Sequence, residues 1–294
     1  MHPALDHIVL LVPNETLANV PAWITDAFTV LDGGAHAGGE TENKLIVFQD
    51  GSYIELISFV RDLDPEKRAR HRWGGRPDGH MIDWALSLLN PSVGSIDGGD
   101  PEQEFRKVQA RVRETRVGLE YEDPVAGGRT TPEGAVLKWV TASPFFTHAA
   151  KDESFGGGEL PFWCLDRTPR TLRVPHEDPA NATHASKVVG IAGVTIVFKD
   201  GKLLERVSAV YEAIHGYTSH LSGHSSHEWV FQAPVSSDGR GWTLRLRTAN
   251  EADGDTRTLP DVFVQLTFFT DGPLRKISGT IANGWKIEFD LVKK

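Results

Sequence analysis

The sequence of 294 residues predicts an α+β fold built from repeated βαβββ modules. Three stretches, near residues 5–60, 81–168 and 190–271, share one order of elements: a strand, a helix, and then two or three strands. Apolar runs or alternating apolar residues mark the strands, and apolar residues three to four positions apart mark the helices. Because a repeat constrains the whole fold, we interpret the three stretches as copies of one module.

The first stretch opens with an apolar strand over residues 5–12. A helix follows, with apolar residues at helical spacing at Leu17, Val20, Ile24 and Phe28. After a glycine-rich loop over 33–39, two strands over 44–48 and 53–59 are joined by a turn. The turn contains Asp50-Gly51, a strong hairpin signal.

The second and third stretches follow the same order. In the second, a helix over 102–116 lies among strands over 82–88, 135–141 and 160–166. In the third, a helix over 203–214 lies among strands over 194–198, 228–232, 243–247 and 262–269, and a strand over 285–291 closes the chain. A polar segment over 174–188 predicts a boundary between a paired domain at 1–175 and a third module at 188–294.

Composition excludes several classes of protein. The single cysteine, Cys164, rules out an internal disulfide framework and zinc-ribbon chemistry. A net charge of -9 without a basic face argues against a nucleic-acid partner. The sequence has no run of about 18 apolar residues, no P-loop and no GxGxxG motif, so we expect no membrane segment and no nucleotide cofactor. We expect a cytoplasmic protein that takes a small-molecule substrate, with a homodimer left open.

Several motifs carry a resemblance to a known family. They are Leu5-Asp6-His7, Tyr53-Ile54-Glu55-Leu56, His71-Arg72-Trp73-Gly74, Ile82-Asp83-Trp84 and Leu160-Pro161-Phe162-Trp163-Cys164. Over residues 5–175 the sequence resembles the glyoxalase-like family of the vicinal oxygen chelate superfamily. The resemblance implies paired modules that curl into an open barrel. It also implies one divalent metal ion (Zn, Mn, Ni or Fe), held by the first and last strands of each module, which polarises a carbonyl group.

His7 and Glu55 are the candidate metal ligands and catalytic residues. By strand alternation His7 is expected to share a face with Leu5 and Val9, and Glu55 a face with Tyr53. A polar group on an apolar strand face needs a partner. That partner is either a neighbouring side chain in the core or, as the resemblance implies, a metal ion. Without the metal, His7 and Glu55 form an acid–base pair.

The second module departs from the family pattern. Trp84 is aligned with His7, and Leu165 or Cys164 with Glu55, so the predicted ligand set is incomplete. The third repeat offers only Gly193 and Gln265. His71 or His80, in the following loop, is the candidate third ligand, which would complete a two-histidine, one-carboxylate set.

Other residues are predicted to bind substrate or to have structural roles. Asn43 is a candidate hydrogen-bond donor to a substrate oxygen, Trp73 to stack on a ligand, and Trp84 and Trp163 to form the wall of an apolar pocket, with core packing as the alternative. His36 is expected to be solvated. The histidines at 215, 220, 224 and 227 lack helical ligand spacing, so we expect a mobile loop there.

Three functions fit this reading. The first is a lyase or isomerase that enolises a small, oxygenated, polyketide-like carbonyl compound, with metal assistance or by acid–base chemistry. The second is a non-catalytic protein that sequesters a planar ligand. The third is an extradiol-type Fe(II) dioxygenase, which needs a second histidine ligand that the sequence does not place.

Overall fold

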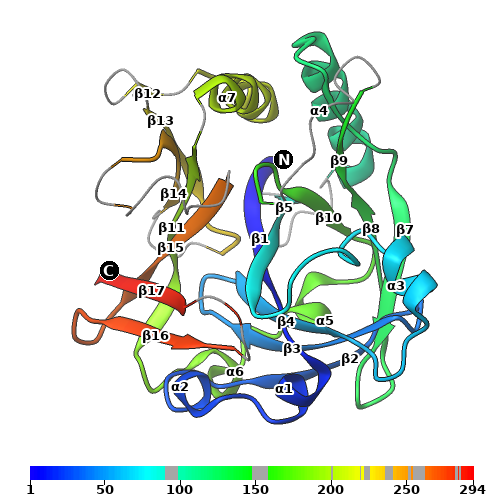
Figure 1. The fold of residues 1–294 in the computed structure, drawn as a ribbon, viewed down its shortest axis with the longest axis vertical. Helices are drawn as coiled ribbons and strands as arrows, with labels where there is room; N and C mark the ends of the chain where they lie inside the picture. Colours follow the sequence, from blue (N-terminus) through cyan, green and yellow to red (C-terminus); the bar gives the residue numbers. More distant parts are fainter. Residues whose placement is uncertain are drawn as a thin grey trace.

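The computed structural model describes residues 1–89, 99–147, 158–199, 201–218, 220–221, 226–235, 241–250, 253, 262–281, 284 and 286–294. Two large β-sheets pack side by side with helices around and between them (Figure 1). This is the predicted α+β class, with a barrel-like sheet and an additional C-terminal sheet. No helix in the described part of the chain has the length and apolar character needed to cross a bilayer.

The N-terminal sheet has eight strands in the order β2-β3-β4-β1-β5-β10-β8-β7. They are β1 (His2–Leu11), β2 (Leu31–Ala35), β3 (Thr41–Val47), β4 (Tyr53–Phe59), β5 (His80–Leu89), β7 (Val125–Thr130), β8 (Val136–Ala142) and β10 (Phe162–Asp166). The outer strands β2 and β7 approach each other, and a bridge between His36 and Arg129 nearly closes the sheet into a barrel. β6 (Leu119–Tyr121) and β9 (Pro144–Phe146) form a separate pair.

Prolines and acidic caps set the helix limits. The predicted helix over 17–28 is two short helices, because Pro21 has no backbone N–H and interrupts it. Pro13 is the N-cap of the first helix and Pro21 that of the second. The long helix α4 starts where Asp100 accepts a hydrogen bond from the Glu102 backbone N–H. The helices are α1 (Asn14–Ala18), α2 (Ala22–Thr25), α3 (Pro65–Arg70), α4 (Pro101–Glu114), α5 (Arg170–Arg173), α6 (Pro179–Ala182) and α7 (Gly201–His215).

The C-terminal sheet repeats the topology of the first one. Its strands are β11 (Val188–Phe198), β12 (His220–Leu221), β13 (Ser226–Gln232), β14 (Gly241–Thr248), β15 (Val262–Thr270), β16 (Lys276–Thr280) and β17 (Lys286–Lys293). β14 pairs parallel to β11, β15 antiparallel to β11, and β17 parallel to β15, as β4, β5 and β10 do around β1. The predicted third module is therefore followed by strands of a fourth unit, without a described helix between β15 and β16.

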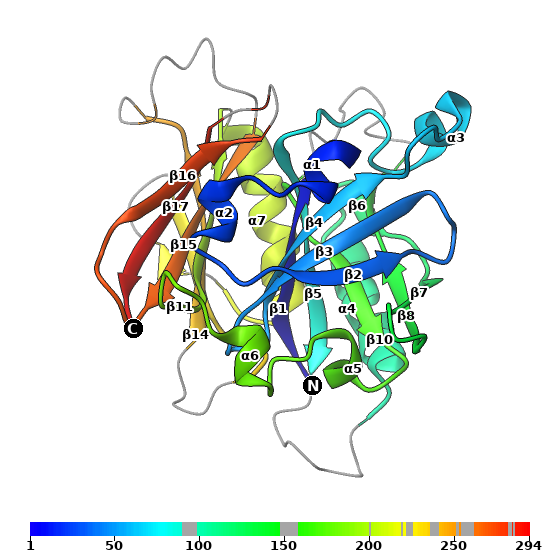
Figure 2. The same cartoon turned by 90° about the horizontal axis from the view of Figure 1, so that it is seen from below.

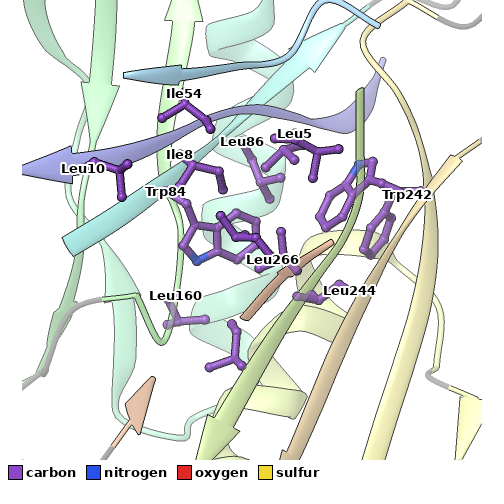
Figure 3. Packing of buried hydrophobic residues seen from close by; sticks show 14 of the residues in the cluster. Leu5, Ile8, Leu10, Ile54, Trp84, Leu86, Leu160, Trp242, Leu244 and Leu266 are labelled. Carbon is purple, nitrogen blue, oxygen red and sulfur yellow. The ribbon is translucent and has the colours of Figure 1, made fainter. Parts of the chain in front are cut away.

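One hydrophobic cluster joins the two sheets. It includes Leu5, Ile8 and Trp84 from the first sheet and Trp242 and Leu266 from the second (Figure 3). Helix α7 contacts β1, β11, β14 and α4, and it lies between the sheets in Figure 2. The first sheet ends before residues 175–188 and the second begins at the last of them, but both sheets share this core. The predicted division into two domains there therefore stays a prediction.

Candidate functional site

A cavity of about 240 Å³ lies inside the N-terminal barrel. Five of the seven predicted site residues line it: His7, Asn43, Glu55, His71 and Trp73. It is also lined by side chains that the sequence analysis did not select, among them His36, Arg72, Arg129, Trp139, Phe162 and Arg173. The strands that wind around the barrel thus bring together residues that are far apart in the sequence.

A β-bulge at Asp6 points His7 into the cavity. Leu5 pairs with Leu86 and His7 with Ala85, so Asp6 is the extra residue in β1. The bulge shifts the alternation of faces by one residue. Leu5 therefore packs in the cluster between the sheets, while His7 lies at the cavity. The prediction that Leu5 and His7 share a face is wrong for this reason.

Asp6 fixes the orientation of His7. The distance from His7 Nδ1 to Asp6 Oδ1 is 2.6 Å. Burial alone would raise the pKa of Asp6, but the guanidinium groups of Arg170 and Arg173 hold it well below its usual range. An ionised Asp6 only accepts hydrogen bonds, so Nδ1 carries the hydrogen, and in neutral His7 Nε2 keeps its lone pair for the cavity.

Arg173 ties this pair to the rest of the barrel. It donates two hydrogen bonds to Asp6 of 2.9 and 2.8 Å, and two to Asp166 of 2.6 and 2.8 Å. It also donates to the Tyr53 hydroxyl at 2.7 Å, and the Tyr53 ring stacks on His7 with 4.6 Å between centroids. Arg170 adds a further hydrogen bond to Asp6. The His7 ring is therefore held from one edge and one face.

Glu55 lies across from His7. Its Oε2 is 3.7 Å from His7 Nε2, which is too long for a hydrogen bond, and its Oε1 accepts a bond of 2.5 Å from Asn43. The Asn43 amide lies directly over Gly33, where an added Cβ would come within 1.8 Å of Asn43 Oδ1. The glycine at position 33 is therefore needed to hold Asn43 against Glu55.

His36 is a site residue that the sequence analysis missed. It was expected to be solvated, yet its Nε2 lies 3.6 Å from Glu55 Oε1, and its Nδ1 lies 2.7 Å from Thr41 Oγ1. Burial lowers its pKa, against the opposing effect of Glu55. The glycine-rich loop gave no sign of this, because the position depends on the bridge between His36 and Arg129 across the barrel.

The loop before β5 supplies His71, Arg72 and Trp73. Arg72 donates to Asp83 at 2.5 Å, and its guanidinium lies 4.8 Å from the Trp73 ring centroid and 4.2 Å from that of Phe162. The Trp73 indole also donates to Asp83, at 2.9 Å. His71 Nδ1 accepts from the Trp73 backbone N–H, and burial lowers its pKa. His80 lies outside this cavity, with Nδ1 2.9 Å from the Asp78 carbonyl oxygen.

The strand register identifies the second-module counterpart of His7. In the antiparallel pair of β1 and β5, Ile8 faces Trp84, and each strand has one bulge, at Asp6 in β1 and at Ile82 in β5. A local two-fold axis through the facing pair exchanges the two bulges. It therefore relates His7 to Asp83, and the alignment of His7 with Trp84 is wrong by one residue.

The counterpart of Glu55 follows from the same axis. Glu55 pairs with Val9 in the parallel pair of β4 and β1, and Phe162 pairs with Ala85 in the parallel pair of β10 and β5. Because the axis relates Val9 to Ala85, the counterpart of Glu55 is Phe162. Neither Cys164 nor Leu165 has this place, as the sequence alignment had expected.

Trp84 and Trp163 do not line the cavity. Both are fully buried on the outer face of the barrel, where Trp84 packs near Tyr211 and Trp242 and Trp163 packs against Phe105. The same one-residue shift explains the error for Trp84. The core-packing alternative describes both residues.

The described residues do not form a complete metal site. Among them, no group of three or more His, Cys, Asp and Glu side chains has a geometry that could hold a metal ion. The first half of the barrel offers His7 and Glu55, but in the second half Asp83 is engaged by Arg72 and Phe162 has no donor atom. The nearby Cys164 is a poor ligand because burial raises the pKa of its thiol well above the usual value.

The C-terminal histidine run shows no metal site where it is described. His215 is the last residue of α7 and packs against Phe231, and His227 lies in β13, 3.7 Å from Glu205, so the prediction of a loop is wrong for these two residues. His224 and the side chain of His220 lie outside the described residues.

The fold has known structural relatives. A hypothetical protein from Staphylococcus aureus aligns over 99% of this chain and 100% of its own, with 13% identity and a TM-score of 0.63. The 2,2',3-trihydroxybiphenyl 1,2-dioxygenase of Sphingomonas wittichii aligns over 99% of this chain and 91% of its own, with 7% identity and a TM-score of 0.46. Glyoxalase I from Zea mays aligns over 98% and 92%, with 11% identity and a TM-score of 0.29.

The family is shown by sequence. No curated protein matches the chain. The family model described as a glyoxalase-like domain matches residues 5–213, which is most of the chain. The match continues beyond the N-terminal barrel into α7. This match confirms the resemblance seen in the motifs: the chain belongs to the glyoxalase-like domain family.

Proposed function

We propose that this protein is a lyase or isomerase that removes a proton from the carbon next to a carbonyl group of a small oxygenated substrate. The observation that carries the proposal is the buried line Asp6–His7–Glu55, which ends at the cavity. Asp6 and His7 are 0% and 3% exposed, so the pair is shielded from bulk water. A histidine oriented by an ionised carboxylate is a common general base.

His7 is the base in this proposal. Its Nε2 accepts the proton from the substrate carbon, and Asp6 stabilises the imidazolium that forms. Glu55, on the other side of the gap of 3.7 Å, holds or relays the proton for its return to a neighbouring carbon or leaving group. Asn43 keeps the Glu55 carboxylate in place.

Arg72 is the candidate for stabilising the enolate. Its guanidinium lies at the cavity in the second half of the barrel, next to the counterparts of His7 and Glu55. A fixed cation facing the developing oxyanion lowers the barrier without rearranging during the reaction. The family resemblance implies that a metal ion stabilises the enolate in related enzymes.

An enzyme that enolises its substrate with the help of a metal ion is the second candidate. It is favoured by the two imidazoles that flank Glu55, with His7 Nε2 and His36 Nε2 at 3.7 and 3.6 Å from its two carboxylate oxygens. It requires Glu55 to leave Asn43 and the three side chains to close on one ion. Metal content of the purified native protein separates the candidates. One equivalent of zinc, manganese or nickel supports the metal-assisted enzyme, and iron supports the extradiol dioxygenase.

Hydrogen exchange in D2O tests the main proposal. The probes are butyrophenone and 3-benzoylpropanoate, which share an aromatic ketone with a CH2 next to the carbonyl, and NMR follows loss of that signal. We expect the protein to accelerate exchange, and His7→Gln and Glu55→Gln each to reduce the rate by about 100-fold or more. His80→Gln, outside the cavity, is the matched control.

The same experiment addresses the sequestering protein. That function predicts that the probes bind without exchange and that binding survives both substitutions. Exchange that is unchanged in His7→Gln would contradict the role of His7.

A further inference from the structure

Arg129 is a buried cation at the cavity. It lies on β7 and is 5% exposed. Its guanidinium donates to the carbonyl oxygen of Gly33 and, at 3.5 Å, to that of Arg173. A guanidinium has five N–H donors and stays charged in proteins, and neither of these two acceptors carries a formal charge.

Arg129 differs from the other arginines that line the cavity. Arg72 is paired with Asp83, and Arg173 is paired with Asp6 and Asp166. Within the described residues, no carboxylate lies within ion-pairing distance of Arg129, although Arg129 is nearly as deeply buried as Arg173 and far more buried than Arg72. Glu55, which lines the same cavity, is engaged by Asn43.

An unpaired buried charge is costly. Burial lowers the pKa of the Arg129 guanidinium, and the nearby Tyr53 and Glu55 oppose this effect only in part. Buried charges are normally paired. A cation that lines a cavity without a counter-ion of its own is therefore suited to receive one from a ligand.

The cavity walls around Arg129 are aromatic. Gly127 precedes it on β7, and an added Cβ there would come within 2.7 Å of the Trp139 indole nitrogen. The glycine thus lets the Trp139 ring lie against the strand, and Tyr53, Trp73 and Phe162 line the same space. Flat apolar walls with one fixed cation fit an aromatic ring that carries an acidic group.

We propose that Arg129 binds the carboxylate of the substrate, and that the substrates of this site are aromatic or similarly flat carboxylic acids. The guanidinium recognises the carboxylate by charge-assisted hydrogen bonds. The proposal rests on the proposed function only for the other end of the substrate, where His7 and Glu55 act on the carbon next to the carbonyl.

Binding of benzoate and benzamide tests the proposal. The two probes have the same shape and differ in charge, and calorimetry at pH 7 measures both. We expect the native protein to bind benzoate at least about tenfold more tightly than benzamide. Arg129→Gln, which keeps a donor for the Gly33 carbonyl, is expected to remove this preference, and Arg129→Lys to keep part of it. Lys138→Gln, which removes an exposed cation from the adjacent strand β8, is expected to change nothing.

Three results would overturn the proposal. They are equal binding of benzoate and benzamide by the native protein, no binding of benzoate, and a preference that survives in folded Arg129→Gln. The first two need no variant, so the test remains decisive if Arg129 is required for folding. Benzoate has no exchangeable proton next to a carbonyl, so its binding does not depend on catalysis. Failure of exchange with preserved benzoate selectivity would contradict only the proposed function.

Discussion

The two halves of the barrel share a backbone plan but present different chemistry to the cavity. In the first half, the two related positions hold His7 and Glu55, two titratable groups whose facing atoms are 3.7 Å apart. In the second half, the same positions hold Asp83 and Phe162, with the Arg72 guanidinium bonded to one and lying over the other. In the proposed reaction the first half transfers the proton, and the second half supplies a fixed positive charge.

The two halves differ in the ligands that they offer to a metal ion. A four-ligand site needs donors from both modules, and here the second module contributes a carboxylate that is already neutralised by a guanidinium. A permanent side-chain cation replaces part of the charge of a metal ion, but it cannot chelate two oxygens of a substrate. In the proposed reaction, the groups that move the proton therefore lie in the first half, and the cation that stabilises the enolate lies in the second.

The largest expected difference is the loss of protein stability when Asp6 or Asp83 is replaced. Asp6→Asn is expected to lower the free energy of unfolding by about 3–5 kcal/mol, because it leaves Arg170 and Arg173 buried with only Asp166. Asp83→Asn is expected to cost less, about 1–3 kcal/mol, because Arg72 is 28% exposed and water can solvate it. Urea denaturation measures both. Equal losses of stability would contradict the idea that water solvates Arg72 but not Arg170 and Arg173.

A second effect is a pH dependence at His184, which lies between α6 and β11 and contacts the first half of the barrel. His184 Nδ1 accepts from the Thr29 N–H and Nε2 donates to the Val47 carbonyl, and burial lowers the pKa of His184 to about 4 from 6.5. The unfolded chain therefore takes up the proton more readily than the folded one. Stability is complete above pH 6.5 and falls by about 3 kcal/mol as the pH drops from 6.5 to 4.

Denaturation at several pH values checks this expectation. In His184→Asn the slope between pH 6.5 and 4 should flatten. A native protein whose stability does not change over this range would contradict a neutral, buried His184. The measurement also shows which part of an acid-side loss of activity comes from unfolding.

A comparable loss of stability, with an added effect on exchange, is expected at Gly33. In Gly33→Ala, the new Cβ would meet Asn43 Oδ1 at 1.8 Å and the Asn43 backbone oxygen at 2.7 Å, so Asn43 must move away from Glu55. We expect about 1–3 kcal/mol of lost stability and slower exchange. Gly99→Ala, outside the cavity and with nothing within 4 Å of the added Cβ, is the control and should behave as the native protein. Exchange at the native rate in Gly33→Ala would remove Asn43 from the account.

The sequence predicted the fold better than the site. Element order and the motifs around His7 and Glu55 were sufficient for the family, which the match over residues 5–213 confirms. Alternation alone could not reveal the bulges at Asp6 and Ile82, because a bulge depends on the partner strand. That one-residue shift misplaced Leu5 and Trp84.

The residues missed by the sequence analysis depend on closure of the barrel. His36 and Arg129 meet only because β2 and β7 approach each other, and Arg173 reaches Asp6 from a segment more than 160 positions away. No local pattern encodes such contacts. A charged residue inside a short, otherwise neutral strand such as β7 is the one signal that could have singled out Arg129.

The exchange rate of 3-benzoylpropanoate in D2O, compared between His7→Gln and Phe162→Leu, tests the central claim most directly. His7 belongs to the first half of the barrel, and Phe162 is the counterpart of Glu55 in the second half. The account predicts a loss of about 100-fold or more in His7→Gln and less than about tenfold in Phe162→Leu, with both proteins folded. Equal losses, or a rate that survives in His7→Gln, would contradict proton transfer by the first half.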